Sequence, residues 1–405
     1  MSTRQKTLDV KDLRPGMFIG DVFNEKNVLL FSSNTLLTGY HQIEYLKKQG
    51  VSAVTVIFQD GKADDGVQKK VINEDTSEQF AEFKNQVRQA ENIRKSTVHA
   101  VRSMVLAVRA GRFFPLNNVI HSLNGLVTQV LQQPDITIGV TQIKNYSEQV
   151  YAHSVNVSVL MIGFASVLGY SKEMVLEAGM AGMLHDIGMV KLPEDLIRKV
   201  GLHTRQELES IKMHPIYGVE ILKRFREELP SSVFHVVAEH HERLNGGGYP
   251  HFLKSHQIQQ MSMLCAIADV YDRLTTAAPS KRACLPQEAL ALIFQGADEE
   301  YPRTLVEHFT KLMGIYPVGS FVKLESGEMG LVVKINRDHL LSPQVVMLFD
   351  RGGRKIENLQ VRDLSRKKES ESEAWKISCS MDPANFGINP ADIFHNHVVI
   401  KFSAI

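Results

Sequence analysis

The spacing of apolar and polar residues divides the chain into three parts of different character. Between about residue 77 and residue 313, apolar residues recur every three or four positions, as at Val101, Met104 and Val108. This spacing places apolar side chains on one face of a helix. Glycine and proline turn signals interrupt the pattern, so the sequence predicts several helices joined by loops.

The first part of the chain predicts a small α+β domain. It contains a turn signal at Arg14-Pro15-Gly16 and a strand-like run from Met17 to Phe31. A helix-like segment from Tyr40 to Gln49 precedes a β-branched run from Val51 to Ile57. Residues 58–76 show no periodicity, which is typical of a linker.

After residue 314 the pattern changes to short apolar runs, which predict strands separated by turns. These runs are Gly319 to Val333, Val345 to Phe349 and Val398 to Phe402. We therefore expect a multidomain protein with an all-α helical bundle, a small α+β N-terminal domain and a small β-rich C-terminal region. The expected boundaries are 1–57 for the N-terminal domain, 58–76 for the linker, 77–137 for connecting helices, 138–313 for the helical domain and 314–405 for the β-rich region.

The composition is that of an ordinary globular protein. The 405 residues carry 46 Lys and Arg against 45 Asp and Glu, which removes the electrostatic case for a dedicated nucleic-acid binder. Three separated cysteines suggest no disulfide framework and favour a reducing, cytoplasmic setting. The apolar stretch from Val155 to Leu168 is too short and too interrupted for a membrane span, so we expect a buried helix there.

Side chains that can bind metal ions occur at five separated places in the helical part. They are His153, the pair His185 and Asp186, His214, the pair His240 and His241, and Asp269. The intervals fit one contribution from each successive helix, and inward-facing residues on several helices are how a bundle builds a metal centre. Seven candidates exceed the needs of one tetrahedral metal and fit two metals that share a carboxylate, for which Asp186 is the natural bridge.

Each of these residues also has a purely structural interpretation. A single histidine on an apolar helix is more often a core or surface residue, and Asp269 can cap a helix. The glycine run from Gly246 to Gly248 can be a plain turn. The joint pattern favours a metal centre, and imidazole and carboxylate donors without thiolate suit iron, manganese, zinc or nickel.

Four strings of residues resemble the HD-GYP phosphodiesterases of bacteria, a branch of the HD superfamily of metal-dependent phosphohydrolases. The strings are His185-Asp186-Ile187-Gly188, His214-Pro215-Ile216-Tyr217-Gly218, the run from His240 to Pro250, and Ala268 to Asp272 with Leu274-Thr275. The similarity covers roughly residues 145–315, and residues 1–57 resemble the small domain often found ahead of this one. The resemblance implies an all-α domain that hydrolyses cyclic di-GMP to pGpG and, in some members, to GMP.

The resemblance also implies the ligands of two divalent metals, with iron or manganese favoured and nickel or zinc compatible. One metal would be held by His153, His185, Asp186 and Asp269, and the other by Asp186, His214, His240 and His241. Such a pair lowers the pKa of a bridging water, so that hydroxide is available for in-line attack. Some members bind a third metal through a Glu where this chain has Gln149, so we expect two metals.

Two positions depart from the family pattern and concern substrate binding. Met189 stands where the family commonly has Lys, and Ala278 stands where it often has Arg. The expected substrate contacts are Gly247, Gly248, Tyr249, Pro250, Lys281 and Arg243. The expected catalytic residues are Asp186, Lys281 and Arg243, of which the last two supply positive charge. Loss of two phosphate-binding cations should weaken substrate binding and the transition state, while the metal ligands are intact.

The departures leave a second function open, a domain of low or absent activity that binds the nucleotide and signals through protein contacts. An HD-type hydrolase of another phosphate ester is disfavoured by the Gly-Tyr-Pro string. The expected ligand is cyclic di-GMP or pGpG, with no nucleic-acid partner and no membrane span. Residues 77–135 have enough apolar side chains to pack on the helical domain or on a second subunit, so a homodimer and signalling partners stay open.

Overall fold

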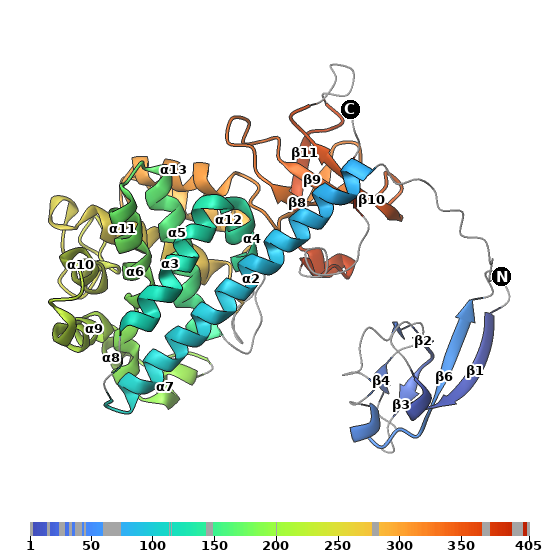
Figure 1. The fold of residues 1–405 in the computed structure, drawn as a ribbon, viewed down its shortest axis with the longest axis horizontal. Helices are drawn as coiled ribbons and strands as arrows, with labels where there is room; N and C mark the ends of the chain where they lie inside the picture. Colours follow the sequence, from blue (N-terminus) through green and yellow to red (C-terminus); the bar gives the residue numbers. More distant parts are fainter. Residues whose placement is uncertain are drawn as a thin grey trace. The chain divides into compact units, whose positions relative to one another are not determined.

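The computed structural model describes residues 3–13, 17–23, 29–31, 35–36, 43, 46–59, 74–112, 114, 116–142, 149–199, 201–277, 283–366, 373–390 and 400–402. The chain forms two compact units, Met1–Val71 and Ile72–Ile405. The second unit has a helical part and a sheet, so a helical centre with strand-containing ends is confirmed (Figure 1). Among the described residues no helix is both long and apolar enough to cross a membrane.

The N-terminal unit is built on a four-stranded sheet with the order β1-β6-β2-β5 and a two-stranded sheet of β3 and β4. The elements are β1 Thr3–Asp9, η1 Val10–Asp12, β2 Phe18–Ile19, β3 Val22–Phe23, β4 Leu29–Phe31, β5 Thr35–Leu36 and β6 Ala53–Gln59. Ile19, Leu46 and Val56 lie in its small core. Strands occur in both predicted runs, whereas the predicted turn at residues 14–16 and most of the predicted helix and linker lie outside the described residues.

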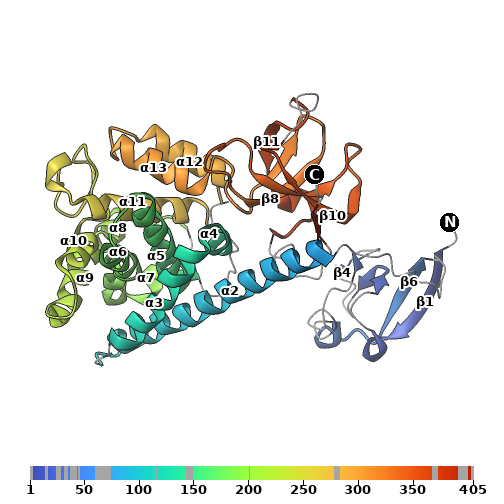
Figure 2. The same cartoon turned by 45° about the horizontal axis from the view of Figure 1, so that its top comes forward.

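The second unit begins with the helical part. Its elements are α2 Glu74–Arg109, α3 Leu116–Gln132, α4 Pro134–Gln142, α5 Gln149–Val167, α6 Lys172–Leu184, η3 Ile187–Lys191, α7 Glu194–Arg198, α8 Arg205–Ile211, α9 His214–Leu222, η4 Lys223–Phe225, α10 Ser231–Glu239, η5 Ser255–Gln257, α11 Gln260–Leu274, α12 Pro286–Gln295 and α13 Arg303–Met313. The long helix α2 runs along this bundle, as the two views agree (Figures 1 and 2).

Helix α5 is the buried centre of the bundle. Its side chains are apolar on nearly all sides, and Val155, Leu160 and Phe164 are fully buried, which confirms the predicted buried helix. Helix α6 packs closely on α5, because a Cβ atom at Gly182 would lie 2.9 Å from Ser158 Cα. Ser158 Oγ also donates a hydrogen bond of 2.7 Å to the carbonyl of Gly179. This contact fixes the carboxyl end of α6.

The C-terminal part is a six-stranded sheet with the order β11-β7-β8-β9-β10-β12. The elements are β7 Phe321–Leu324, β8 Met329–Lys334, β9 Gln344–Phe349, β10 Lys355–Asp363, β11 Ile377–Met381, η7 Pro383–Phe386 and β12 Ile400–Phe402. One face packs on Val87 of α2 and Ile136 of α4, and the other face has its own apolar cluster around Val332. Strands β7, β8 and β9 confirm the predicted runs, while β10 and β11 lie in segments for which no strand is predicted.

Candidate metal centre

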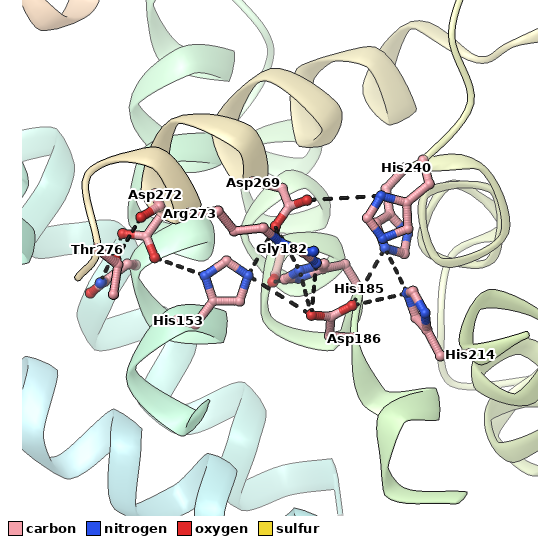
Figure 3. Close-up of polar contacts among 12 residues, drawn as sticks. His153, Gly182, His185, Asp186, His214, His240, Asp269, Asp272, Arg273 and Thr276 are labelled. Carbon is pink, nitrogen blue, oxygen red and sulfur yellow. Dashed lines mark hydrogen bonds and ion pairs between the residues drawn. The ribbon is translucent and has the colours of Figure 1, made fainter. Parts of the chain in front are cut away.

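The seven predicted ligand side chains converge on one place in the bundle (Figure 3). His153 lies on α5, Asp269 lies on α11, and His214 is the first residue of α9. The two adjacent pairs, His185 with Asp186 and His240 with His241, each begin at the C-cap residue of a helix, α6 and α10 respectively. A helix end lets neighbouring side chains turn to the same side, which the middle of a helix does not allow.

Asp186 stands between two groups of histidines. Its Oδ1 atom lies 3.1 Å from His214 Nε2 and 3.5 Å from His240 Nε2. Its Oδ2 atom lies 3.4 Å from His185 Nε2 and 3.8 Å from His153 Nε2. Each carboxylate oxygen therefore faces a different group, as a bridging ligand requires.

Asp269 completes the side of the centre that contains His153 and His185. Its Oδ1 atom lies 2.9 Å from His153 Nε2 and 3.7 Å from His185 Nε2. Its Oδ2 atom lies 4.0 Å from His241 Nδ1. Each of the two carboxylates thus contacts histidines of both groups, and these histidines come from more than one helix.

Two glycines allow the backbone segments of the site to approach each other. A Cβ atom at Gly188 would overlap the carbonyl oxygen of His214, so this position brings the turn after Asp186 against the start of α9. A Cβ atom at Gly248 would overlap the backbone of Glu242. Both glycines belong to the strings that the sequence singles out, and their role here is close packing.

Hydrogen bonds at Nδ1 orient the imidazoles. The bonds run from His185 to Gly182 O at 2.8 Å, from His214 to Ile211 O at 2.7 Å, from His240 to Val236 O at 3.1 Å, and from His153 to Asp272 Oδ2 at 2.7 Å. When Nδ1 donates, the lone pair on Nε2 is available to the centre of the site. Three of the four acceptors are backbone carbonyls within one helical turn.

His153 is held instead by side chains from other helices. Asp272 on α11 accepts from His153 and also accepts a 3.0 Å hydrogen bond from Asn156 Nδ2 on α5. Asn156 Oδ1 in turn accepts a 3.1 Å bond from Arg94 Nε on α2. We call this chain of contacts, from Arg94 through Asn156 and Asp272 to His153, the relay. It links the long helix α2 to the site.

Several buried polar atoms of the site lack hydrogen-bond partners among the described residues. They include His185 Nε2, His241 Nε2, Asp186 Oδ1 and Asp269 Oδ2. A buried polar atom without a partner costs about 1–3 kcal/mol, so a cluster of such atoms needs a ligand. Two sets of ligand atoms lie within 4.8 Å of one another, one from Asp186, His214, His240 and His241, and one from His153, His185 and Asp186. The donor set therefore fits two divalent metal ions.

The pKa values of the histidines differ between the two groups. Burial alone would lower the pKa of His185, but the charges and hydrogen bonds of Asp186 and Asp269 outweigh it and raise that pKa to about 10. The pKa of His153 is raised in the same way by Asp269 and Asp272 against the effect of burial. Burial and neighbouring histidine charges lower the pKa of His240 to about 4 and that of His241 well below its usual value.

Both carboxylates remain ionised despite their burial, which by itself would raise their pKa values. The charges of His185 and Arg273 hold the pKa of Asp186 well below its usual range. Arg273 and His153 do the same for the pKa of Asp269. Ionised carboxylates are the form in which metal ions bind.

The loop after His241 contains the predicted substrate contacts Gly247, Gly248, Tyr249 and Pro250. The buried carboxylate of Glu242 holds this loop, because it accepts hydrogen bonds from the backbone N–H groups of His251 at 2.7 Å and Leu253 at 2.9 Å. The Tyr249 ring stacks on the His241 ring with centroids 4.5 Å apart. The loop is thus fixed directly beside a candidate ligand.

The other predicted cations have different surroundings. Arg243 turns to the backbone, donating a 2.8 Å bond to Glu242 O, and lies over the Tyr301 ring with Glu300 nearby. Lys281 and Ala278 lie outside the described residues, as does the Gln149 side chain.

Arg273 is a site residue that the sequence interpretation missed. It donates from Nε to Asp269 Oδ1 at 2.7 Å and from a terminal nitrogen to Asp186 Oδ2 at 3.3 Å. Arg273 lies four residues after Asp269 on a predicted helix, which places both side chains on one face, and this spacing was the sequence signal that could have identified it.

Comparison with known proteins gives two family matches. The HD domain family model matches residues 140–305, and a model described as a domain of unknown function (DUF3391) matches residues 5–119. A cyclic di-GMP phosphodiesterase of Pseudomonas aeruginosa is 33% identical over 285 residues, which cover 69% of this chain and 68% of the relative. A cyclic di-GMP phosphodiesterase of Thermotoga maritima is 32% identical over 164 residues, covering 40% of this chain and 45% of the relative.

Among solved structures, an HDG"Y"P protein of Bdellovibrio bacteriovorus, Bd1817, is similar with a TM-score of 0.47 and 18% sequence identity. The match covers 76% of this chain and 99% of that chain.

Proposed function

Since the chain belongs to the HD-GYP branch of the HD-domain phosphodiesterases, we propose that it hydrolyses cyclic di-GMP to linear pGpG, and further to GMP, at a two-metal centre. Its relatives from two organisms are cyclic di-GMP phosphodiesterases. The observation that carries the proposal is the convergence of seven ligand side chains, five of which have a buried polar atom without a hydrogen-bond partner among the described residues.

The proposed ligand sets follow the two groups around Asp186. His153, His185, Asp186 and Asp269 hold one ion, and Asp186, His214, His240 and His241 hold the other. Two bound divalent cations supply a water of lowered pKa and neutralise the charge that grows on the phosphodiester during attack. Iron or manganese is our first choice, as the resemblance to the HD-GYP family implies, and imidazole nitrogens with carboxylate oxygens are compatible donors for both.

The residues of the chain perform the remaining tasks. The Nδ1 hydrogen bonds keep the imidazoles in the orientation that presents Nε2 to the centre. The loop fixed by Glu242 places the Tyr249 ring and the backbone of Gly247 and Gly248 at the edge of the site, where a nucleotide can contact them. The alternative of an inactive nucleotide-binding domain is less favoured, because drift away from activity has no reason to preserve the whole ligand set.

The test is a chromatographic assay of cyclic di-GMP with protein loaded with Mn²⁺ or Fe²⁺. We expect pGpG to appear first and GMP to follow, and we expect a chelator to stop both. The variant His308→Ala changes an exposed histidine on α13 and serves as a control that should behave as the original protein does. Tight nucleotide binding without any product from loaded protein would favour the binding-domain alternative instead.

A further inference from the structure

Arg273 occupies the boundary between the buried carboxylates and solvent. Its side chain is 47% exposed, whereas the side chains of Asp269 and Asp186 that it contacts are 1% and 16% exposed. Figure 3 shows its guanidinium directed at both of them. The Arg273 side chain therefore contacts the buried carboxylates and is still partly exposed to solvent.

The guanidinium of Arg273 contacts the carboxylates through some of its N–H groups. Nε and Nη2 contact the carboxylates, and within the described part of the chain Nη1 has no acceptor. Guanidinium groups bind carboxylates and phosphates through parallel N–H groups in one plane, so a group already anchored by one edge presents its remaining N–H groups in a fixed direction.

The charges of the site call for such a cation. Asp186, Asp269 and Asp272 bring three negative charges into the centre, and two divalent metals would leave a net charge of one positive. A cyclic dinucleotide carries two negative phosphodiester charges. Met189 stands where the family commonly has Lys, and Arg243 contacts backbone carbonyls and Glu300. Among the residues that the structure describes, Arg273 is the Lys or Arg side chain that contacts Asp186 and Asp269.

We propose that Arg273 binds a non-bridging phosphate oxygen of the dinucleotide while it remains anchored on Asp269 and Asp186. This inference rests on the proposed function and assigns the substrate phosphate a protein contact in this chain. It differs from two other roles for the same residue, which are positioning of the carboxylates alone and competition with the metal ions for them.

The experiment compares Arg273→Gln and Arg273→Lys with the original protein and with Arg303→Gln as a matched control. Arg303 is also half-exposed, at 46%, and also pairs with an aspartate, Asp298 at 2.6 Å, but it lies on α13. Three quantities are measured, which are the metal content per chain, the equilibrium binding of pGpG and of inorganic phosphate, and kcat and KM for cyclic di-GMP.

We expect Arg273→Gln to keep its metal content and to lose roughly tenfold to a hundredfold in pGpG and phosphate affinity, with a raised KM. Arg273→Lys should fall between Arg273→Gln and the original protein, and it provides the binding comparison should the Gln variant fold poorly. Unchanged affinity, a loss of metal, or a gain in metal affinity in the variants would each overturn the inference.

Failure of the proposed function gives a different pattern. In that case the original protein itself shows no product from cyclic di-GMP. The phosphate and pGpG binding of the Arg273 variants relative to Arg303→Gln would then still decide whether Arg273 binds phosphate.

Discussion

The two halves of the metal centre are built in different ways. We call His153, His185 and Asp269 the carboxylate half, and His214, His240 and His241 the imidazole half, with Asp186 between them. The carboxylate half has Asp272 as a further acidic neighbour, at 2.7 Å from His153. In the imidazole half His214 and His240 face one oxygen of Asp186, and His214 Nε2 lies 3.2 Å from His240 Nε2.

This difference explains why buried histidines of one cluster have pKa values shifted in opposite directions. Burial acts on both halves and disfavours the charged imidazole, but in the carboxylate half the acidic neighbours outweigh it. In the imidazole half burial lowers the pKa of His240, the charges of His185 and His214 add to this effect, and Asp186 offsets only part of it. Neutral imidazole is the form that binds a metal, so the lowered pKa values of His240 and His241 favour the metal-binding form of these two side chains.

The halves also differ in how their side chains are held. His214 and His240 donate to carbonyls three or four residues before them, so their orientation is set by the local helix. The orientation of His153 depends on Asp272, Asn156 and Arg94, which come from three helices. His153 in the carboxylate half is therefore the ligand whose geometry depends on the tertiary fold and on helix α2, since His185 bonds to the nearby carbonyl of Gly182.

Replacement of Asp186, the residue that both halves share, should affect metal binding in the two halves equally. Asp186→Asn keeps the shape of the side chain and removes its charge, so we expect both metal ions to be lost and activity to fall by roughly a thousandfold, about 4 kcal/mol of transition-state stabilisation. Metal analysis and the cyclic di-GMP assay measure the two effects. Asp195→Asn on the exposed surface of α7 is the control, and full metal content in Asp186→Asn would disprove the bridging assignment.

Single histidine replacements should distinguish the halves in the stability of metal-free protein. His153→Ala removes a charge-assisted bond to the buried carboxylate of Asp272, which should cost about 1–3 kcal/mol of unfolding free energy. His214→Ala removes a bond to a backbone carbonyl and should cost about 0.5–1.5 kcal/mol. Urea unfolding with a chelator present measures both values, and the reverse order would contradict our description of the two halves.

The most local expected effect is a change in metal affinity at one half of the centre, caused by a replacement in the relay. Asn156→Ala removes a bond to Asp272 without touching a proposed ligand, so we expect roughly tenfold to a hundredfold weaker metal binding at the carboxylate half alone. Competition with a chelator at increasing concentration should show one weakened and one unchanged metal. Asn124→Ala on α3 is the control, and equal weakening of both metals would show that the relay does not act on one half.

The sequence predicted the candidate ligands because they are single residues with distinctive chemistry at helix-sized intervals. His185 and Asp186 can point toward the same place because helix α6 ends at this pair. The relay was not predictable, because Arg94 and Asp272 are polar residues on separate helices and their meeting depends on how α2, α5 and α11 pack.

The fold shows a similar limit. Strands β8 and β9 are buried on both faces over most of their length and are mostly apolar, and β7 is apolar except for the exposed Lys323, so the pattern predicts them. Strand β1, TRQKTLD, has a single apolar residue, and β10, KIENLQVRD, carries many polar and charged residues, so both become strands through pairing with neighbours. Arg273 escaped notice for a comparable reason, since one charged residue on a helix is ordinary until its two carboxylate partners are known.

The number of metal ions bound per chain tests the two-half centre most directly. Mass spectrometry of protein purified without added metal, and of the same protein after incubation with Mn²⁺, measures this number. Our account predicts about two ions in the original protein and about one in each of His153→Ala and His214→Ala. A single ion in the original protein, lost equally in both variants, would contradict it.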